Sequence, residues 1–308
     1  MKLMLNTIFL GTPAMAVPFL EKLQQKTKIA AVVTSPDQPA GRGYALKAPE
    51  VKAAAQKLSL PLLQPASLKD AQAAEQIRAV NSDVGIVVAY GKLLPKAVLT
   101  LAKYGFLNVH FSLLPKYRGA APIQWALING EQETGVTLFW LDEGMDTGPV
   151  FLQKKMTIQP DDDADSLRNK LVELGVSMMV EALENIQNGK IVKEDQKGTP
   201  SKAPMLKKED GQINWSKPAD VICNQLRGMT PWPGVHFGGL KILKAKPIYE
   251  NGKVGAGVVT RLVSGEGPVV ECGQNSLELL QVQPEGKKPM PAWSWWQGAR
   301  LKLGDKLR

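Results

Sequence analysis

The chain has 308 residues, 44% hydrophobic and 22% charged, which is typical of a folded globular protein with room for one or two domains. No apolar run approaches the roughly 20 residues that a membrane-spanning helix needs, so we expect no membrane contact. The formal net charge is +9, and the 2 cysteines show no disulfide or metal-binding spacing, which favours a reduced, cytoplasmic location.

The first part of the chain alternates strands with helices. The strands are apolar on both faces, so they predict an α/β fold: a Rossmann-like, open, mostly parallel sheet covered by helices on both faces. Ligands of such sheets bind beyond the carboxyl ends of the strands. The predicted strands are residues 7–12, 29–34, 84–90, 105–110, 135–142 and 150–158, and the predicted helices are 14–25, 50–58, 71–80, 121–129 and a longer one that ends near residue 188.

The chain changes in character after residue 189. Residues 190–208 contain six lysines and two prolines with little apolar periodicity, so we interpret them as a basic linker. From residue 209 onward, short β runs punctuated by glycine predict a smaller C-terminal OB-like β-barrel. We therefore expect three parts: residues 1–189, the linker 190–208, and the barrel 209–308.

Positive charge is concentrated in the last part. Residues 1–189 contain 19 Lys and Arg against 18 Asp and Glu, whereas residues 190–308 contain 19 against 11. A basic half-chain is typical of polyanion binders such as nucleic-acid-binding proteins, but it also serves solubility, and charge alone leaves both interpretations open. For Trp293, Trp295 and Trp296, core or lid packing is favoured over base stacking.

Candidate reactive residues lie at the end of the predicted strand 105–110. Asn108 and His110 are two residues apart, so their side chains share one face of the strand. Asp146 follows the next strand in a glycine-flanked loop, where we expect its carboxylate to orient the imidazole and raise its pKa above roughly 6.5. We interpret the neighbouring Asp142 and Glu143 as turn residues, and His236 as structural.

The sequence lacks the motifs of several other kinds of catalytic or binding site. No cysteine or second histidine lies near His110 for zinc, and the acidic loop lacks the spacing of a calcium site, so we expect no metal. The phosphate-binding glycine motifs and the nucleophile elbow of serine hydrolases are also missing. Asn, His and Asp together favour acid–base chemistry with oxyanion stabilisation, and spacing alone indicates nothing more specific.

These residues lie within motifs that resemble the formyltransferases that use 10-formyltetrahydrofolate. The resemblance implies that Asn108, His110 and Asp146 form the catalytic set, without a metal. It also implies that the turn Ser112, Leu113, Leu114 and Pro115 binds the folate cosubstrate. The matching motifs are Asn108-Val109-His110, Ser112-Leu113-Leu114-Pro115, Arg118-Gly119-Ala120-Ala121-Pro122-Ile123 and Asp146-Thr147-Gly148.

Further motifs are similar to the methionyl-tRNA formyltransferase family over nearly the full length. The resemblance implies a Rossmann-like domain, a linker and an OB-like barrel, with initiator methionyl-tRNA as partner. It implies that Arg42 contacts the tRNA acceptor end, although Tyr44-Ala45-Leu46-Lys47 replaces the consecutive lysines that usually follow. We expect a monomer. The motifs are Phe9-Leu10-Gly11-Thr12-Pro13, Pro36-Asp37-Gln38-Pro39-Ala40-Gly41-Arg42-Gly43, Asn214-Trp215 and Pro231-Trp232-Pro233-Gly234.

Other activities share the same catalytic core. A formyltransferase that acts on an amino-sugar nucleotide is the main alternative, and a formyltetrahydrofolate hydrolase would use water as the acceptor. The loop that contains Arg42 and the basic residues 190–308 favour tRNA over both. A tRNA-binding module with a vestigial core is a further alternative, but the complete Asn, His and Asp set argues against it.

Overall fold

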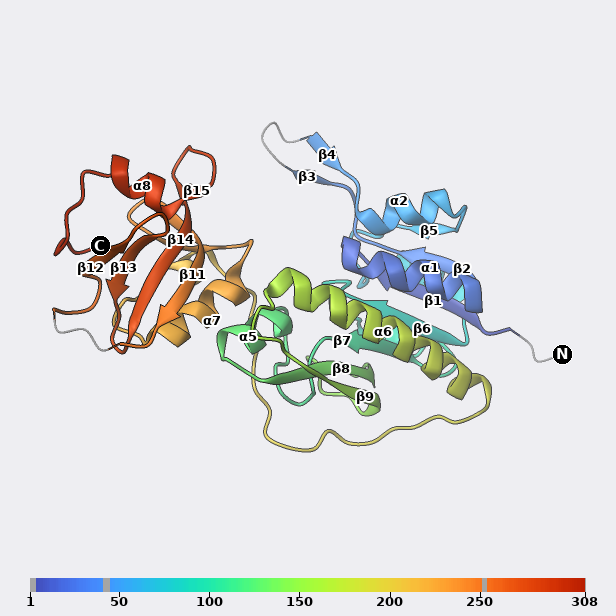
Figure 1. The fold of residues 1–308 in the computed structure, drawn as a ribbon. Coiled ribbons are helices and arrows are strands. Elements are labelled where there is room, and N and C mark those ends of the chain that lie inside the picture. Colours follow the sequence, from blue (N-terminus) through green and yellow to red (C-terminus); the bar gives the residue numbers. More distant parts are fainter. Residues whose placement is uncertain (1–3, 41–44, 251–253, 308) are drawn as a thin grey trace. The chain divides into compact units, whose positions relative to one another are not determined.

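The computed structural model describes residues 4–40, 45–250 and 254–307. The chain divides into two compact units, which are described separately (Figure 1). The first unit contains the residues up to Pro122 together with Glu133–Thr157 and Arg168–Pro204, and the second contains Ile123–Gln132, Ile158–Leu167 and the residues from Met205 onward. Within the described ranges, no helix is both long enough and apolar enough to cross a membrane.

A seven-stranded sheet forms the centre of the first unit. Its order is β5 (Leu62–Leu63), β2 (Lys28–Val33), β1 (Asn6–Gly11), β6 (Val84–Val88), β7 (Phe106–His110), β8 (Glu133–Trp140) and β9 (Val150–Thr157). The strands from β5 to β7 pair in parallel, while β8 is antiparallel to β7 and β9 is antiparallel to β8. The open, mostly parallel sheet expected from the sequence is confirmed.

Helices α3 (Ala71–Ala79) and α4 (Lys96–Leu99) cover one face of this sheet. Ile77 of α3 and Val98 of α4 belong to the same buried cluster as Ile8 of β1 and Phe106 of β7. The sequence did not reveal α4, because its single turn is too short to show a helical period. Burial of these side chains supplies most of the free energy that holds the helices on the sheet.

Helices α1 (Val17–Lys26) and α6 (Ala164–Gln187) lie on the other face (Figure 1). Phe19 of α1 meets Phe111 edge to face, with ring centroids 6.3 Å apart. A side chain at Gly175 of α6 would place its Cβ 2.8 Å from the Phe19 ring and 3.3 Å from Val109. Glycine at this position therefore allows α6 to pack closely against α1 and β7.

The residues after β2 contain more structure than the loop expected between residues 35 and 49. Strands β3 (Gln38–Ala40) and β4 (Ala45–Lys47) pair antiparallel, and α2 (Glu50–Lys57) follows. These strands are only three residues long and contain Pro39, which hides any period-2 pattern. Arg42 falls between the two strands and lies outside the described residues.

The second unit contains an antiparallel sheet, as expected. Its order is β10 (Val235–Phe237), β11 (Leu240–Ile248), β14 (Ser276–Pro284), β13 (Gly267–Glu271) and β12 (Val259–Val263), and β15 (Met290–Pro291) pairs with β14. Two helices that the sequence analysis did not identify accompany it, α7 (Ala219–Met229) and α8 (Ala292–Gly298). Arg227 of α7 donates hydrogen bonds to the carbonyls of Gln159 (3.2 Å) and Pro160 (3.1 Å), which joins α7 to the segment before α6 within this unit.

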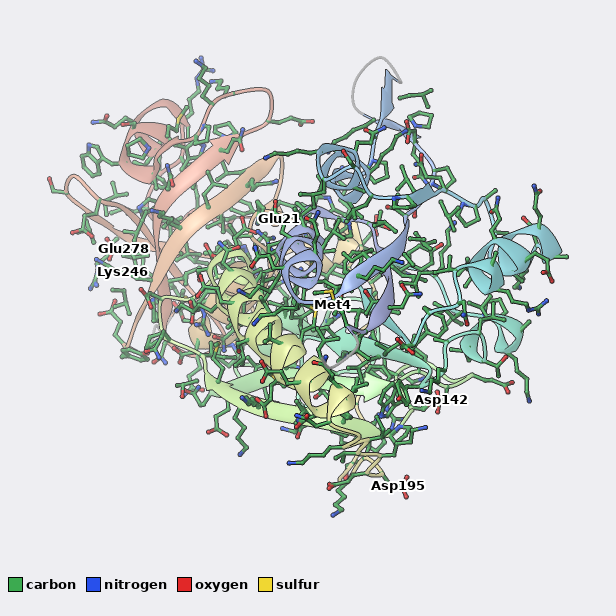
Figure 2. The ribbon with its side chains drawn as sticks, turned by 90° about the vertical axis from the view of Figure 1, so that its right-hand side faces the viewer. Met4, Glu21, Asp142, Asp195, Lys246 and Glu278 are labelled. Atoms are coloured by element: carbon green, nitrogen blue, oxygen red, sulfur yellow. The ribbon has the colours of Figure 1, made fainter. Side chains whose placement is uncertain are left out.

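A carboxylate buried in the sheet of the second unit pairs with a half-exposed lysine. Glu278 is 2% exposed and its carboxylate lies 3.3 Å from Nζ of Lys246 (Figure 2). Lys246 also pairs with Glu266 at 2.6 Å. Burial raises the pKa of Glu278 above its ordinary value. Lys246 thus faces two carboxylates, one on β14 and one in the turn before β13, and its single charge balances only one of them.

Candidate active site

The candidate active site begins at the carboxyl end of β7. Phe106, Asn108 and His110 alternate along the strand and therefore share a face, the one that α3 and α4 cover. His110 is 5% exposed, whereas Asn108 is half-buried. No described group forms a hydrogen bond with the side-chain amide of Asn108, so this amide is available to a ligand.

The structure brings His110 and Asp146 together, as the sequence predicted. Nδ1 of His110 lies 3.7 Å from Oδ2 of Asp146, and Nε2 lies 2.9 Å from the carbonyl oxygen of Tyr117. A carbonyl can only accept, so we assign the proton of the neutral ring to Nε2. Nδ1 is then the basic atom of the ring, and a proton that it accepts would face the Asp146 carboxylate.

Burial lowers the pKa of His110 below its usual value, and this effect outweighs Asp146 and the Tyr117 carbonyl, which both raise it. The expectation that the carboxylate would raise the pKa above its usual value was wrong. The reason is that a ring 5% exposed has lost nearly all of the water that would stabilise its charged form. His110 is therefore a neutral base near physiological pH.

The depressed pKa predicts where activity is lost in acid. Protonation of His110 removes the base, so we expect His110 to contribute to an acid loss of activity only below about 6.5, the ordinary histidine value. The measurement is an NMR titration of His110 in the free protein beside a pH profile of kcat/KM, because kcat/KM also reports ionisation of the free substrates. A His110 titration centred above the ordinary histidine value would contradict the dominance of burial.

Asp146 lies in a sharply turned loop between β8 and β9. Its backbone φ of 54° is left-handed, a conformation that costs a residue other than glycine about 1–3 kcal/mol. The backbone N–H of Gly119 donates to Oδ2 of Asp146 at 2.7 Å. The neighbouring Asp142 accepts hydrogen bonds from the Gly144 N–H (3.0 Å) and the Thr147 hydroxyl (2.7 Å), which confirms that Asp142 forms the turn.

Gly119 is required by a close backbone approach. Its φ is 126°, and a Cβ there would lie 2.5 Å from the carbonyl oxygen of Ala203. We therefore expect Gly119→Ala to displace the N–H that Asp146 accepts and to lower kcat by about 10²-fold, the typical cost of a 1 Å misplacement. The check is kcat beside that of Ala120→Ser, an exposed neighbour. Equal kcat for both variants would contradict the role of the Gly119 N–H.

The turn from Ser112 to Pro115 is held by two residues that the sequence analysis missed, Thr137 and Gln153. The Thr137 hydroxyl donates to the Ser112 carbonyl at 2.6 Å and accepts from the Leu114 N–H at 3.1 Å. Gln153 donates to the Leu114 carbonyl at 3.0 Å and to the Thr137 hydroxyl at 2.9 Å. In strand register His110, Thr137 and Gln153 lie opposite one another, so a polar row across β7, β8 and β9 was the available signal.

Within this turn Ser112 has a structural contact of its own. It is fully buried, and its hydroxyl donates to the Lys116 carbonyl at 2.6 Å. Leu114 and Pro115 are also buried, while Leu113 is half-buried. A ligand at the turn would therefore reach Leu113 and backbone groups first.

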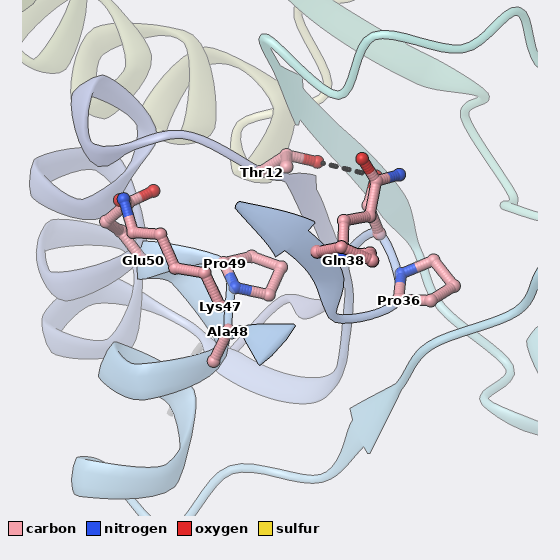
Figure 3. Close-up of a pocket in the computed structure, with 9 residues that line it drawn as sticks. Thr12, Pro36, Gln38, Lys47, Ala48, Pro49 and Glu50 are labelled. Atoms are coloured by element: carbon pink, nitrogen blue, oxygen red, sulfur yellow. Dashed lines mark hydrogen bonds and ion pairs between the residues drawn. The ribbon is translucent and has the colours of Figure 1, made fainter. Parts of the chain in front are cut away.

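A cavity of about 240 Å³ lies at the carboxyl end of β1, at the base of the β3–β4 pair (Figure 3). The Thr12 hydroxyl lies 3.2 Å from the Ser35 hydroxyl and donates to the Tyr90 carbonyl at 3.2 Å. Lys47 and Glu50 form an ion pair of 2.7 Å on another wall of the cavity. Hydroxyls, an ion pair and three prolines thus form its walls.

The contacts and burial of the other candidate residues indicate structural roles. Nδ1 of His236 lies 3.3 Å from the Gly234 carbonyl in a turn, and Trp296 is 8% exposed. Burial raises the pKa of the free thiols of Cys223 and Cys272 to about 12, so both stay protonated and unreactive. Among the residues with described positions, no three of the side chains that bind metals cluster as a metal site would require.

The fold resembles those of solved formyltransferases. A crystal structure of a sugar 3N-formyl transferase, solved in the presence of dTDP and 5-N-formyl-THF, matches with a TM-score of 0.70 and 20% identity over 92% of this chain and 99% of that chain. The N-formyltransferase of Helicobacter canadensis, in complex with folinic acid and dTDP-3-aminofucose, matches with a TM-score of 0.69 and 20% identity over 90% and 99%. At this identity the likeness concerns the fold.

Sequence relatives match over nearly the whole length. The methionyl-tRNA formyltransferase of Citrifermentans bemidjiense is 43% identical over 306 residues, 98% of this chain and 96% of that protein. That of Thermodesulfovibrio yellowstonii is 44% identical over 302 residues, 96% and 97%. Residues 5–183 match the family described as formyl transferase, and residues 205–300 match the formyl transferase C-terminal domain. On these grounds the chain belongs to the formyl transferase family.

Proposed function

We propose that the chain transfers a formyl group from 10-formyltetrahydrofolate to the α-amino group of methionine on initiator methionyl-tRNA, in translation initiation. The observation that carries this proposal is that buried His110 pairs with Asp146 and shares a strand face with Asn108, whose amide forms no hydrogen bond with described residues. The acceptor is supported by relatives named methionyl-tRNA formyltransferase that are 43% and 44% identical over nearly the full chain.

The acceptor amine needs little activation. A peptide α-amine has a pKa of roughly 7.7–8.0, and the ester in an aminoacyl-tRNA lowers it further, so much of the amine is neutral and nucleophilic. Its nitrogen attacks the formyl carbon, and the carbonyl becomes an oxyanion. The bond from this carbon to N10 of the folate then breaks. The amine loses a proton and N10 gains one, so collapse of the intermediate is the difficult step.

Asn108 supplies the donor for the oxyanion in this proposal. Its amide is half-buried at the end of β7 and forms no hydrogen bond with described residues, so it needs no rearrangement to donate. One donor of this kind is typically worth about 2.7–4 kcal/mol in the transition state.

His110 and Asp146 move the proton. Nδ1 of the neutral His110 accepts it from the cationic amine of the intermediate and returns it to N10. The carboxylate 3.7 Å away stabilises the imidazolium in between. Such acid–base assistance typically contributes about 10²–10⁴-fold in rate. The Ser112–Pro115 turn binds the folate through Leu113 and backbone groups.

The tRNA contacts two regions in this proposal. Arg42 contacts the acceptor end, as the resemblance to the family implies, and the basic residues of the C-terminal part bind backbone phosphates. In this proposal residues 1–189 form the catalytic domain and residues 209–308 form the tRNA-binding domain. Residues 190–208 link the two domains. The enzyme acts as a monomer in the cytoplasm.

One assay tests the acceptor. The enzyme receives 10-formyltetrahydrofolate labelled in the formyl group, with methionyl-charged initiator tRNA, an amino-sugar nucleotide or water alone. Label on the methionine of the tRNA supports the proposal. Label that appears only on the sugar nucleotide, or only as free formate, overturns it in favour of a sugar formyltransferase or a hydrolase.

Charge reversal tests the tRNA-binding part. Lys287 and Lys288 are exposed in the second unit, and we expect their joint replacement by glutamate to weaken tRNA binding. The slope of log K against log salt should become shallower by about 1–2, because each lost phosphate contact contributes about 0.7–0.9. The matched control reverses the exposed Lys26 and Lys28 beside the amino end of β2. If the salt dependence of tRNA binding is unchanged in the Lys287 and Lys288 variant, these two charges serve solubility and do not contact the tRNA.

A further inference from the structure

Residues 190–204, here called the connecting segment, lie hydrogen-bonded along the first unit. Near its start the indole N–H of Trp140 donates to the Val192 carbonyl at 2.8 Å. Glu194 and Val150 exchange both backbone hydrogen bonds, at 2.7 and 3.0 Å. The segment is therefore fixed to the end of β8 and to the start of β9, on either side of the loop that contains Asp146.

The far end of the connecting segment contacts the turn beside His110. Arg118 donates its N–H to the Ser201 carbonyl at 2.9 Å, and its own carbonyl accepts from the Ala203 N–H at 2.7 Å. The Ser201 hydroxyl accepts from the N–H of Tyr117 at 2.9 Å, and Tyr117 supplies the carbonyl that faces Nε2 of His110. The same segment thus contacts the backbone on both sides of the catalytic pair.

Between these ends, one side chain joins the two loops. The amide nitrogen of Gln196 donates to the carbonyls of Asp146 and Gly148, both at 2.9 Å. Its amide oxygen accepts from Nη2 of Arg118 at 2.7 Å and from Nε at 3.2 Å. The primary amide therefore uses both donors and both acceptor sites, with a different loop on each side.

The separation of the catalytic pair depends on both loops. The carboxylate of Asp146 is held by Gly119, which follows Arg118, while its backbone is left-handed and costly. Without Gln196, the Asp146 and Gly148 carbonyls lose their donor and Arg118 loses its acceptor, so the two loops lose the side chain that joins them directly and depend more on the Gly119 bond. We propose that Gln196 is a positioning residue that sets the Asp146 carboxylate against His110, an inference that rests on the proposed function.

Two substitutions distinguish the donor function of the Gln196 amide from its acceptor function. Gln196→Met keeps the length of the side chain and removes every hydrogen bond. Gln196→Glu keeps an acceptor for Arg118 but removes both donors to the Asp146 loop. Asp195→Ala is the matched control, because the Asp195 side chain is exposed on the outer side of the same segment (Figure 2).

For formyl transfer to methionyl-tRNA we expect both Gln196 variants to lower kcat about 10–100-fold, with KM for 10-formyltetrahydrofolate within about threefold of the parent. Asp195→Ala should stay within about twofold. Thermal unfolding midpoints accompany these measurements, because a purely structural role would lower the midpoint without this split between kcat and KM. Parental kcat in both Gln196 variants overturns the proposal.

A second readout does not depend on activity. The chain has 2 histidines, so NMR titration resolves His110 once the other signal is assigned by its loss in His236→Asn. Retreat of the Asp146 carboxylate in Gln196→Met should move the His110 titration to lower pH than in the parent. A loss of kcat with an unshifted His110 titration would also overturn the positioning role.

The two proposals fail in different ways. If the parent protein formylates no methionyl-tRNA, the proposed function is wrong, and the titration alone then decides whether Gln196 positions Asp146. A shifted titration in that case supports the positioning, and an unshifted one overturns it.

Discussion

Asp146→Asn is expected to lower kcat by about 10²–10⁴-fold, the range of a lost acid–base partner. The amide keeps an oxygen that can accept from the Gly119 N–H, so the loop is preserved. What it lacks is the charge that stabilises a protonated His110 at 3.7 Å. The measurement is a single-turnover rate of formyl transfer at saturating substrates, which isolates the chemical step.

The same loop offers the control. Glu143 is a carboxylate three residues away whose partner is the exposed Lys96 at 2.9 Å. Glu143→Gln removes the same charge at the surface and should leave the rate within about twofold. A near-parental rate in Asp146→Asn would remove Asp146 from the proposed proton transfer.

Asn108→Ala is expected to lower kcat by about 10²–10³-fold, because the oxyanion loses its hydrogen-bond donor at the moment when charge develops. The KM for 10-formyltetrahydrofolate should change far less, since the donor acts mainly in the transition state. The measurement is steady-state kinetics with both substrates varied.

Asn108→Asp separates chemistry from packing at this position. The aspartate side chain has nearly the same volume but offers acceptors in place of donors, and its charge would repel the oxyanion. Its rate should be no faster than that of Asn108→Ala. A rate for Asn108→Asp near the parental value would show that the side chain fills space only.

Asn108 and His110 were predictable from sequence because they share one face at the end of a strand. The sheet alone does not bring Asp146 to them, because β8 is antiparallel to β7 and ends opposite Leu107. The loop after β8 returns and places the Asp146 carboxylate 3.7 Å from Nδ1 of His110. Thr137 and Gln153 were missed, although they lie in predicted strands. Single polar residues in such strands do not indicate which backbone groups they contact.

Gln196 and the pKa of His110 were not predictable, for different reasons. Gln196 lies 78 residues from Arg118 in a segment without apolar periodicity, because that segment is held mainly by backbone hydrogen bonds, which any residue can form. The direction of the His110 pKa depends on how much water the fold removes around the ring. A neighbouring carboxylate is visible in the sequence, whereas burial is not.

The connecting segment limits how proteins of this fold can be recombined. A chimera joined at residue 189 would take residues 190–204 from the second parent, with Gln196 and Ser201, and place them against Asp146 and Tyr117 of the first. A junction after Pro204 keeps these partners within one lineage. The contacts of the connecting segment therefore place a junction some fifteen residues later than the change in composition indicates. The exchanged residues must still match Gln159 and Pro160 of the other parent, whose carbonyls accept from Arg227.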